Sequence, residues 1–305
     1  MSTDGTLSIG ELAERTGVTV KTVRFYSDRG LLPEAARSSG GHRRYGPESI
    51  DRLRLIRSLR TLDLPVPVVG RVLDQEDGLE DVIAGQLQEL GSQLAALRWR
   101  EASLQMLRDC TAEERADRLR LIGAVAAPPS TAALARFWRR WLPARLPARL
   151  VSAIIEQAVP QPPTDPTPAQ VLAFARLHAF VSRPCPGTDQ GQPAAHRPDH
   201  GYRPAVLYDG LGEAYALASA SLRAQRPPQE GEALDCFVSA YAHSCGTRDT
   251  PTFRRRLSGL LAADPRIDHY WQLTAELRGP SEPTPGAAHD WLCAALDTHT
   301  ARPAA

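Results

Sequence analysis

Long apolar runs are missing from this 305-residue sequence. No window approaches the ~18–20 apolar residues of a membrane-spanning helix, and the amino terminus lacks the basic start and apolar run of a secretion signal. The cysteines form no C-x-x-C motif, which argues against a disulfide framework and a cysteine-rich zinc site. They are Cys110, Cys185, Cys236, Cys245 and Cys293. These absences predict a soluble cytoplasmic protein with no membrane partner.

The net charge of +1 is also small, but the charges are segregated along the chain. Residues 1–60 contain 11 basic and 7 acidic side chains, whereas residues 61–127 contain 7 and 12, and residues 128–305 contain 18 and 16. A basic amino-terminal segment is typical of a nucleic-acid-binding module, although a solvated basic surface has the same composition. The hydrophobic content of 42% excludes a disordered chain, and the length suggests two domains.

The first thirty residues have the pattern of two short helices joined by a turn. Ser8 with Glu11 three residues later forms a capping box, which predicts the start of a helix. Gly17 provides the backbone freedom for a tight turn, and Thr19 then caps a second helix that runs to about Arg29. This arrangement is a helix-turn-helix.

The second helix is predicted to have a buried face with Val20 and Val23 and an outer polar face. The outer residues can donate hydrogen bonds to phosphates and base edges; they are Lys21, Thr22, Arg24 and Tyr26. A plain amphipathic helix with a solvated basic face is the alternative. A flexible Ser-Ser-Gly-Gly segment follows, and then Arg43, Arg44 and Tyr45 precede a third helix predicted over residues 47–62. These three residues are expected on a loop or hairpin that holds DNA phosphate.

These motifs resemble the MerR family of bacterial transcription regulators. The segment TVRFYSDRGLL at residues 22–32 is similar to the family phrase T-[IVL]-R-[YF]-Y-E-x-x-G-L-L, and Arg43-Arg44-Tyr45 with Ile50 and Leu53 is similar to its wing phrase. Ser27 stands where that family usually has an acid. The resemblance implies a winged helix-turn-helix DNA-binding domain over residues 1–75.

The resemblance also implies roles for the residues that match. Lys21, Thr22 and Arg24 would face the major groove, Tyr26 would contact a phosphate, and Arg43 with Arg44 would hold the DNA backbone. Tyr45 and Phe25 would either join this surface or pack the junction between wing and helix. The second wing of the family would be residues 63–73. Because Pro65 and Pro67 lack an N–H there, its contact with phosphate is left open.

A heptad pattern begins at Leu79 in a stretch without proline that extends to about Val125. Apolar residues recur at steps of four and three, which predicts a long coiled-coil helix; they are Ile83, Leu87, Leu90, Leu94, Leu97 and Leu104. A helix inside an intramolecular bundle is the alternative. The resemblance implies that residues 76–127 form an antiparallel homodimer, whose symmetry matches a pseudo-palindromic operator.

Residues 128–305 follow a Pro-rich linker and show helical patterns interrupted by prolines, with no alternating strand pattern. The fold class is therefore predicted to be mostly all-α. A segment at 183–204, rich in proline, glycine and histidine, is predicted to be a loop that acts as a lid, binds a ligand or is disordered. The sequence has no nucleophile elbow, phosphate loop or dense His/Asp/Glu cluster, so we expect no enzyme, no metal and no cofactor. His196 and His200 fall in this loop, where their spacing predicts no metal site.

Aromatic residues are spread over several helices of this region and form either its core or a ligand pocket. The candidates are Trp138, Trp141, Tyr215, Tyr241, Tyr270, Trp271 and Trp291. An effector domain is usual in the resembled family, and this one is loosely similar to the antibiotic-binding domain of TipA-type regulators. We therefore predict a pocket for a small apolar, drug-sized effector, with a volume of ~300 Å³ or more.

The prediction as a whole is a homodimeric MerR-type regulator. It binds a promoter operator in double-stranded DNA, acts on RNA polymerase there, and remodels the spacer DNA in response to the effector. The alternative is an architectural factor whose helical domain docks a protein partner without a small effector.

Overall fold

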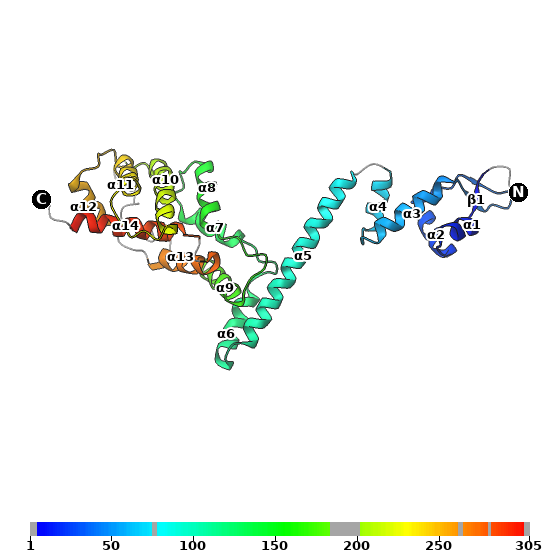
Figure 1. Cartoon of the computed structure of the whole chain (residues 1–305), viewed down its shortest axis with the longest axis horizontal. Coiled ribbons are helices and arrows are strands. Elements are labelled where there is room, and N and C mark those ends of the chain that lie inside the picture. The colour runs from blue at the N-terminus through cyan, green and yellow to red at the C-terminus, as the bar shows by residue number, and fades with distance from the viewer. Residues whose placement is uncertain (1–4, 75–77, 184–201, 262–264, 280–281, 302–305) are drawn as a thin grey trace. The chain divides into compact units, whose positions relative to one another are not determined.

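The computed structural model describes residues 5–74, 78–183, 202–261, 265–279 and 282–301. The chain divides into two compact units, residues 1–93 and 94–305, and each is described by itself. The described residues form fourteen helices and one small three-stranded sheet (Figure 1), which confirms a mostly all-α fold. None of the helices in these ranges is long and apolar enough to cross a membrane.

The first unit begins with the helix-turn-helix that the capping residues predict. Helix α1 spans Ile9–Thr16 and α2 spans Val20–Asp28. The Ser8 hydroxyl accepts a hydrogen bond from the Glu11 amide at 3.2 Å, and the Ser8 amide donates to the Glu11 carboxylate at 2.7 Å. Gly17 ends α1 with φ of +67°, a conformation that favours glycine. These local contacts set where both helices begin and end.

A small antiparallel sheet forms the wing. Its strands are β1 (Leu7–Ser8), β2 (Ala36–Arg37) and β3 (Arg43–Tyr45), in the order β1-β3-β2. Arg37 pairs with Arg43 across the β2–β3 hairpin. The hairpin turn contains Gly41 with φ of +80°, so the Ser-Ser-Gly-Gly segment is the tip of the wing.

The core of this unit lies where α1 and α2 meet α3 (Glu48–Arg60) and α4 (Val66–Leu73). Leu12, Val23 and Leu53 are completely buried there. The prediction that Val20 is also buried is wrong, because its side chain is 41% exposed. Val20 is the first residue of α2, at the end of the helix that the core does not reach.

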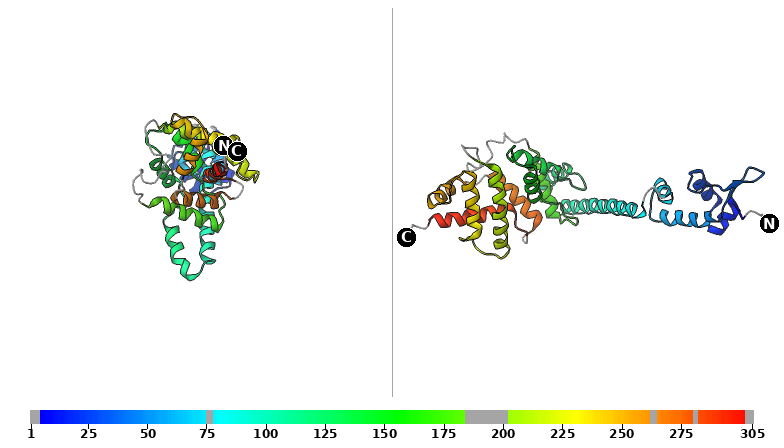
Figure 2. Two further views of the ribbon diagram at one scale, coloured as in Figure 1. Left: turned by 90° about the vertical axis from the view of Figure 1, so that its left-hand side faces the viewer. Right: turned by 90° about the horizontal axis from the view of Figure 1, so that it is seen from above.

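The long helix is shorter than its heptad pattern predicts. Helix α5 spans Leu79–Arg108, and a separate helix α6 spans Ala112–Gly123, so a single helix to Val125 is wrong. Thr111 caps α6, accepting from the Glu114 amide at 3.3 Å and donating its own amide to the Glu114 carboxylate at 3.0 Å. Arg118 on α6 donates to the Met106 carbonyl at 3.2 Å, and α6 runs back beside the end of α5 (Figure 2).

The described residues of the second unit form eight further helices. They are α7 (Ala132–Trp141), α8 (Ala148–Ala158), α9 (Pro168–Ser182), α10 (Pro204–Arg223), α11 (Glu232–Ser244), α12 (Pro251–Leu260), α13 (Pro265–Arg278) and α14 (Pro285–Ala301). Most of the predicted loop at 183–204, including His196 and His200, lies outside the described residues.

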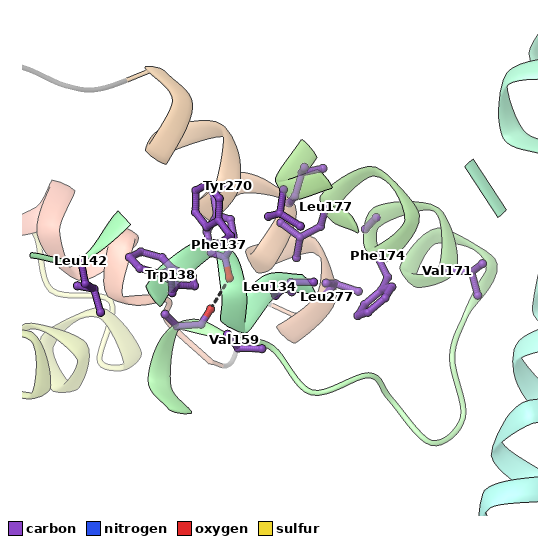
Figure 3. Close-up of a cluster of buried hydrophobic side chains, with 14 of the residues drawn as sticks. Leu134, Phe137, Trp138, Leu142, Val159, Val171, Phe174, Leu177, Tyr270 and Leu277 are labelled. Atoms are coloured by element: carbon purple, nitrogen blue, oxygen red, sulfur yellow. Dashed lines mark hydrogen bonds between the residues drawn. The ribbon is translucent and has the colours of Figure 1, made fainter. Parts of the chain in front are cut away.

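Two clusters of buried side chains hold this unit together. In the first, from α7, α9 and α13, the rings of Phe137 and Tyr270 stack at 5.6 Å (Figure 3). The Tyr270 hydroxyl donates to the carbonyl of Ala158 at 2.8 Å, which satisfies the one polar atom of that side chain. The second cluster joins α10, α11, α12 and α14 around Phe237 and Leu292.

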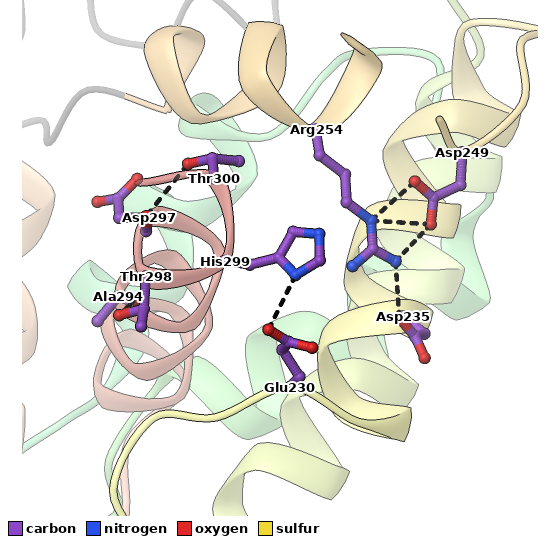
Figure 4. Close-up of polar contacts among 9 residues, drawn as sticks. All are labelled: Glu230, Asp235, Asp249, Arg254, Ala294, Asp297, Thr298, His299 and Thr300. Carbon is purple, nitrogen blue, oxygen red and sulfur yellow. Dashed lines mark hydrogen bonds and ion pairs between the residues drawn. The ribbon is translucent and has the colours of Figure 1, made fainter. Parts of the chain in front are cut away.

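A polar network fastens the ends of this second cluster. Arg254 on α12 donates to Asp249 and to Asp235 of α11, both at 2.6 Å, and His299 on α14 lies 3.1 Å from Glu230 (Figure 4). The hydrogen bonds that Arg254 donates to Asp249 and Asp235 raise its pKa, against the opposing effect of its burial. Because the guanidinium bridges two segments at once, it ties α12 to α11.

Candidate nucleic-acid interface

Helix α2 presents two basic side chains to solvent. Lys21 and Arg24 are both exposed, and within the described part of the chain neither forms an ion pair. Thr22 is less available, because it is half-buried and its hydroxyl lies 2.9 Å from that of Thr19, the residue that caps the helix. Tyr26 is only 9% exposed and packs edge-on against Phe25. The basic pair is therefore the part of α2 that is most free to reach a ligand.

The wing arginines are already engaged with acidic residues. Arg43 lies 2.5 Å from Asp28, at the end of α2, and 3.5 Å from Glu34. The hydrogen bond to Asp28 raises the pKa of Arg43. Arg44 lies 3.9 Å from Glu11. Arg43 thus joins the wing to α2, and a DNA phosphate at this position would compete with the two carboxylates.

Tyr45 does not belong to this surface. Its side chain is completely buried in the core of the first unit, so the expectation that it contacts DNA is wrong and the packing alternative holds. Tyr45 is the last residue of β3 and pairs with Leu7 of β1, another buried residue of this core.

Two exposed arginines near this surface are absent from the predicted DNA-binding residues. Arg37 stands opposite Arg43 on the wing, and its side chain is 59% exposed. Arg29 lies over the ring of Phe25 at 4.9 Å, and Phe25 itself is exposed. Pairing residues symmetrically about the Ser-Ser-Gly-Gly turn would have identified Arg37 from the sequence.

We expect the substitution Arg43→Ala to weaken binding to every duplex by a similar factor. It removes one cationic side chain near the phosphates from each protomer and leaves Asp28 without this ion pair, while Glu34 keeps its pair with Arg37. In the proposed dimer two phosphate contacts are lost, so the slope of log K against log[salt] should decrease by about 2. Fluorescence anisotropy at several salt concentrations measures the slope, with Arg223→Ala on α10 as a control of equal charge. An unchanged slope would contradict the wing assignment.

Helix α4, which covers the segment expected to be a second wing, starts after Pro65 and has Pro67 in its first turn. Neither proline has an amide hydrogen to offer. A phosphate at the start of α4 would therefore have fewer backbone amides to bind.

The predicted apolar stripe of α5 is open to solvent in the single chain. All six side chains are 41–68% exposed; they are Ile83, Leu87, Leu90, Leu94, Leu97 and Leu104. The opposite face, with Trp99 and Met106, is buried in the second unit. Six large apolar side chains in a row are unusual on a monomer surface, so no described part of the chain takes the place of a bundle partner.

The aromatic candidates of the helical unit divide between core and cavity. Trp138, Trp141, Tyr215 and Trp271 line a cavity of about 190 Å³. Tyr241 and Tyr270 are core residues, and Trp291 is buried with its indole N–H bonded to the carbonyl of Arg226. The cavity is smaller than the ~300 Å³ expected for a drug-sized ligand, and its wall includes Asp268, His289 and Asp290. The cavity at the predicted aromatic residues is therefore smaller than the drug-sized pocket expected there, and its wall is partly polar.

A second cavity of about 330 Å³ lies between α5, α6 and α9. Its lining is almost entirely apolar and includes Trp99, Ile122 and Val171 but none of the predicted aromatic candidates. Among the described residues, no group of three or more His, Cys, Asp or Glu side chains is arranged to hold a metal ion.

The first unit has the fold of a DNA-binding module, a helix-turn-helix with a β-hairpin wing. Residues 7–76 match the model of the MerR HTH family regulatory protein. This part of the chain is a MerR family helix-turn-helix domain, as the sequence motifs predict.

Several curated proteins are similar to this chain. The nodulation protein NolA of Bradyrhizobium sp. is 44% identical over 87 residues, which are 28% of this chain and 37% of NolA. The ZntR homologue of Haemophilus influenzae, an HTH-type transcriptional regulator, is 29% identical over 123 residues, 38% of this chain and 91% of that protein. The transcriptional activator TipA of Streptomyces coelicolor is 45% identical over 67 residues, 22% of this chain and 26% of TipA.

The chain spans well under two thirds of NolA and TipA. The named functions of the ZntR homologue and TipA are transcriptional, not enzymatic. They agree with the expectation of a regulator.

Proposed function

We propose that this protein is a homodimeric, DNA-binding transcription regulator of the MerR type. The observation that carries the proposal is the winged helix-turn-helix with Lys21 and Arg24 exposed on the same face of its second helix. Exposed basic groups on a recognition helix suit the acceptor atoms of phosphates and guanine edges. The family match of residues 7–76 supports the same function.

The exposed apolar stripe of α5 supports the dimer. Antiparallel pairing of two such helices would bury both stripes and relate the two DNA-binding domains by a two-fold axis. A dimer with this symmetry binds a pseudo-palindromic operator. We place the protein in the cytoplasm, bound to the nucleoid at its target promoter.

The proposed mechanism is deformation of promoter DNA. The dimer binds an overlong spacer between the promoter elements, and the liganded form bends and untwists it so that RNA polymerase contacts both. The effector acts by favouring one DNA shape over another, because it binds one conformation of the dimer more tightly.

The helical unit is the proposed site of effector binding. The alternative, a docking surface for a protein partner, predicts a long exposed apolar groove on this unit. Outside α5, the exposed large hydrophobic residues of its described part are only Leu119 and Val206. This small number of exposed apolar side chains, together with the cavity beside Trp138, favours a small ligand over a protein partner.

Selection of bound sequences from random duplex DNA tests the proposal. We expect the full chain to enrich an inverted repeat, and footprinting should protect both half-sites together. Enrichment of a single half-site, or of no sequence, would contradict the dimeric regulator and favour an architectural role.

A further inference from the structure

The cavity of about 190 Å³ in the second unit has an aromatic wall with a fixed geometry. The ring of Trp138 lies 5.3 Å from that of Trp141 and 5.4 Å from that of Trp271. Trp271 packs directly on the backbone of Gly286, where a Cβ atom would come within 2.1 Å of its Cγ. No side chain other than hydrogen fits there, so Gly286 holds the Trp271 ring in place.

Acidic groups stand at the same cavity. Asp268 and Asp290 are part of its lining, and no Lys or Arg is among the described lining residues. Burial raises the pKa of Asp290, and the charge of Asp268 raises it further. The Asp290 carboxylate is thus less stable in its ionised form than it would be in water, and a cation placed between it and the rings would relieve this.

The remaining polar groups supply no positive charge at neutral pH. Burial lowers the pKa of His289 to about 4, so its imidazole is neutral. It lies 3.1 Å from the Tyr215 hydroxyl and 3.4 Å from the thiol of Cys293. Burial raises the pKa of that thiol to about 12, which keeps it protonated. These three side chains form a neutral network beside the carboxylates.

We propose that this cavity binds a small organic cation of the alkylated ammonium type, with the charge held by the faces of Trp138, Trp141 and Trp271 and by the carboxylates of Asp268 and Asp290. Aromatic faces attract such cations through the ring quadrupole, and the volume suits a ligand smaller than a drug molecule.

The inference rests on the proposed function in one respect: the bound cation would be the effector of the proposed regulator. Binding itself is a property of the second unit, whose cavity residues all lie within residues 138–293. The two ideas can therefore be tested separately on one preparation of the full chain.

Calorimetric titration with choline, and with its neutral isostere 3,3-dimethylbutan-1-ol, provides the test. The two probes share shape and hydroxyl but differ in charge, so we expect choline to bind at least tenfold more tightly. Asp290→Asn and Trp271→Leu should each weaken choline binding tenfold or more. Asp290→Asn should leave binding of the neutral probe nearly unchanged. Asp117→Asn on α6 and Trp99→Phe on α5 are matched controls outside this cavity.

Equal affinity for the two probes, or no binding of choline by the folded chain, would overturn the inference. Circular dichroism checks that each variant is folded, and Asp290→Asn, which keeps the shape of the side chain, decides the outcome if Trp271→Leu is unstable. Choline binding without selection of an inverted repeat would count against the regulator alone. Selection of a repeat without choline binding would count against the cation site alone.

Discussion

The double substitution Leu90→Glu with Leu97→Glu should convert the protein to a monomer that no longer binds an operator. Both leucines lie on the exposed stripe of α5, two turns apart. A dimer would lose four buried leucine side chains, each contributing ~1.5–3 kcal/mol, and would gain four buried carboxylates. The loss of ~6 kcal/mol or more corresponds to an increase in the dimer dissociation constant of about ten-thousandfold.

Sedimentation velocity over a range of concentrations measures the expected change. The matched control is Gln88→Glu with Ser92→Glu, which adds the same charge to α5 at exposed positions outside the stripe. The control should remain dimeric and bind DNA normally. If the leucine variant still sediments as a dimer, the stripe is not the dimer interface and another surface must join the subunits.

Local signals in the sequence were sufficient to predict the helix-turn-helix. Ser8 and Thr19 cap their helices through contacts three residues away, so a short window contains the whole interaction. Thr111 and Glu114 form the same kind of capping box, which marks a new helix start inside the stretch that the heptad pattern covers. No proline separates the two helices, but the capping box starts a new helix, and α5 therefore ends at Arg108.

The surroundings of the site could not be predicted in this way. The ion pair of Arg43 with Asp28 joins residues fifteen positions apart through the packing of wing on helix. The sorting of the aromatic residues depends on how α7, α10, α13 and α14 meet, which leaves Trp271 at a cavity and Tyr270 beside it in the core. Helical spacing alone gives both residues the same apolar character.

Removing the two basic side chains of the recognition helix should abolish most specific DNA binding. In the proposed dimer, Lys21→Ala with Arg24→Ala deletes four contacts to phosphates or base edges, and a good base contact contributes ~1–3 kcal/mol. The operator affinity should fall by ~4 kcal/mol or more, about a thousandfold. Because both side chains are exposed and unpaired within the described residues, the melting temperature should change little.

Anisotropy titration against the selected repeat and against a scrambled duplex separates specific from general binding. Arg120→Ala with Arg223→Ala removes the same charge from α6 and α10, so it controls for net charge. The specific affinity should fall more than the nonspecific affinity, since only the former includes contacts with bases. An equal fall for both duplexes would mean that Lys21 and Arg24 touch only phosphates, and no fall at all would show that α2 does not enter the groove.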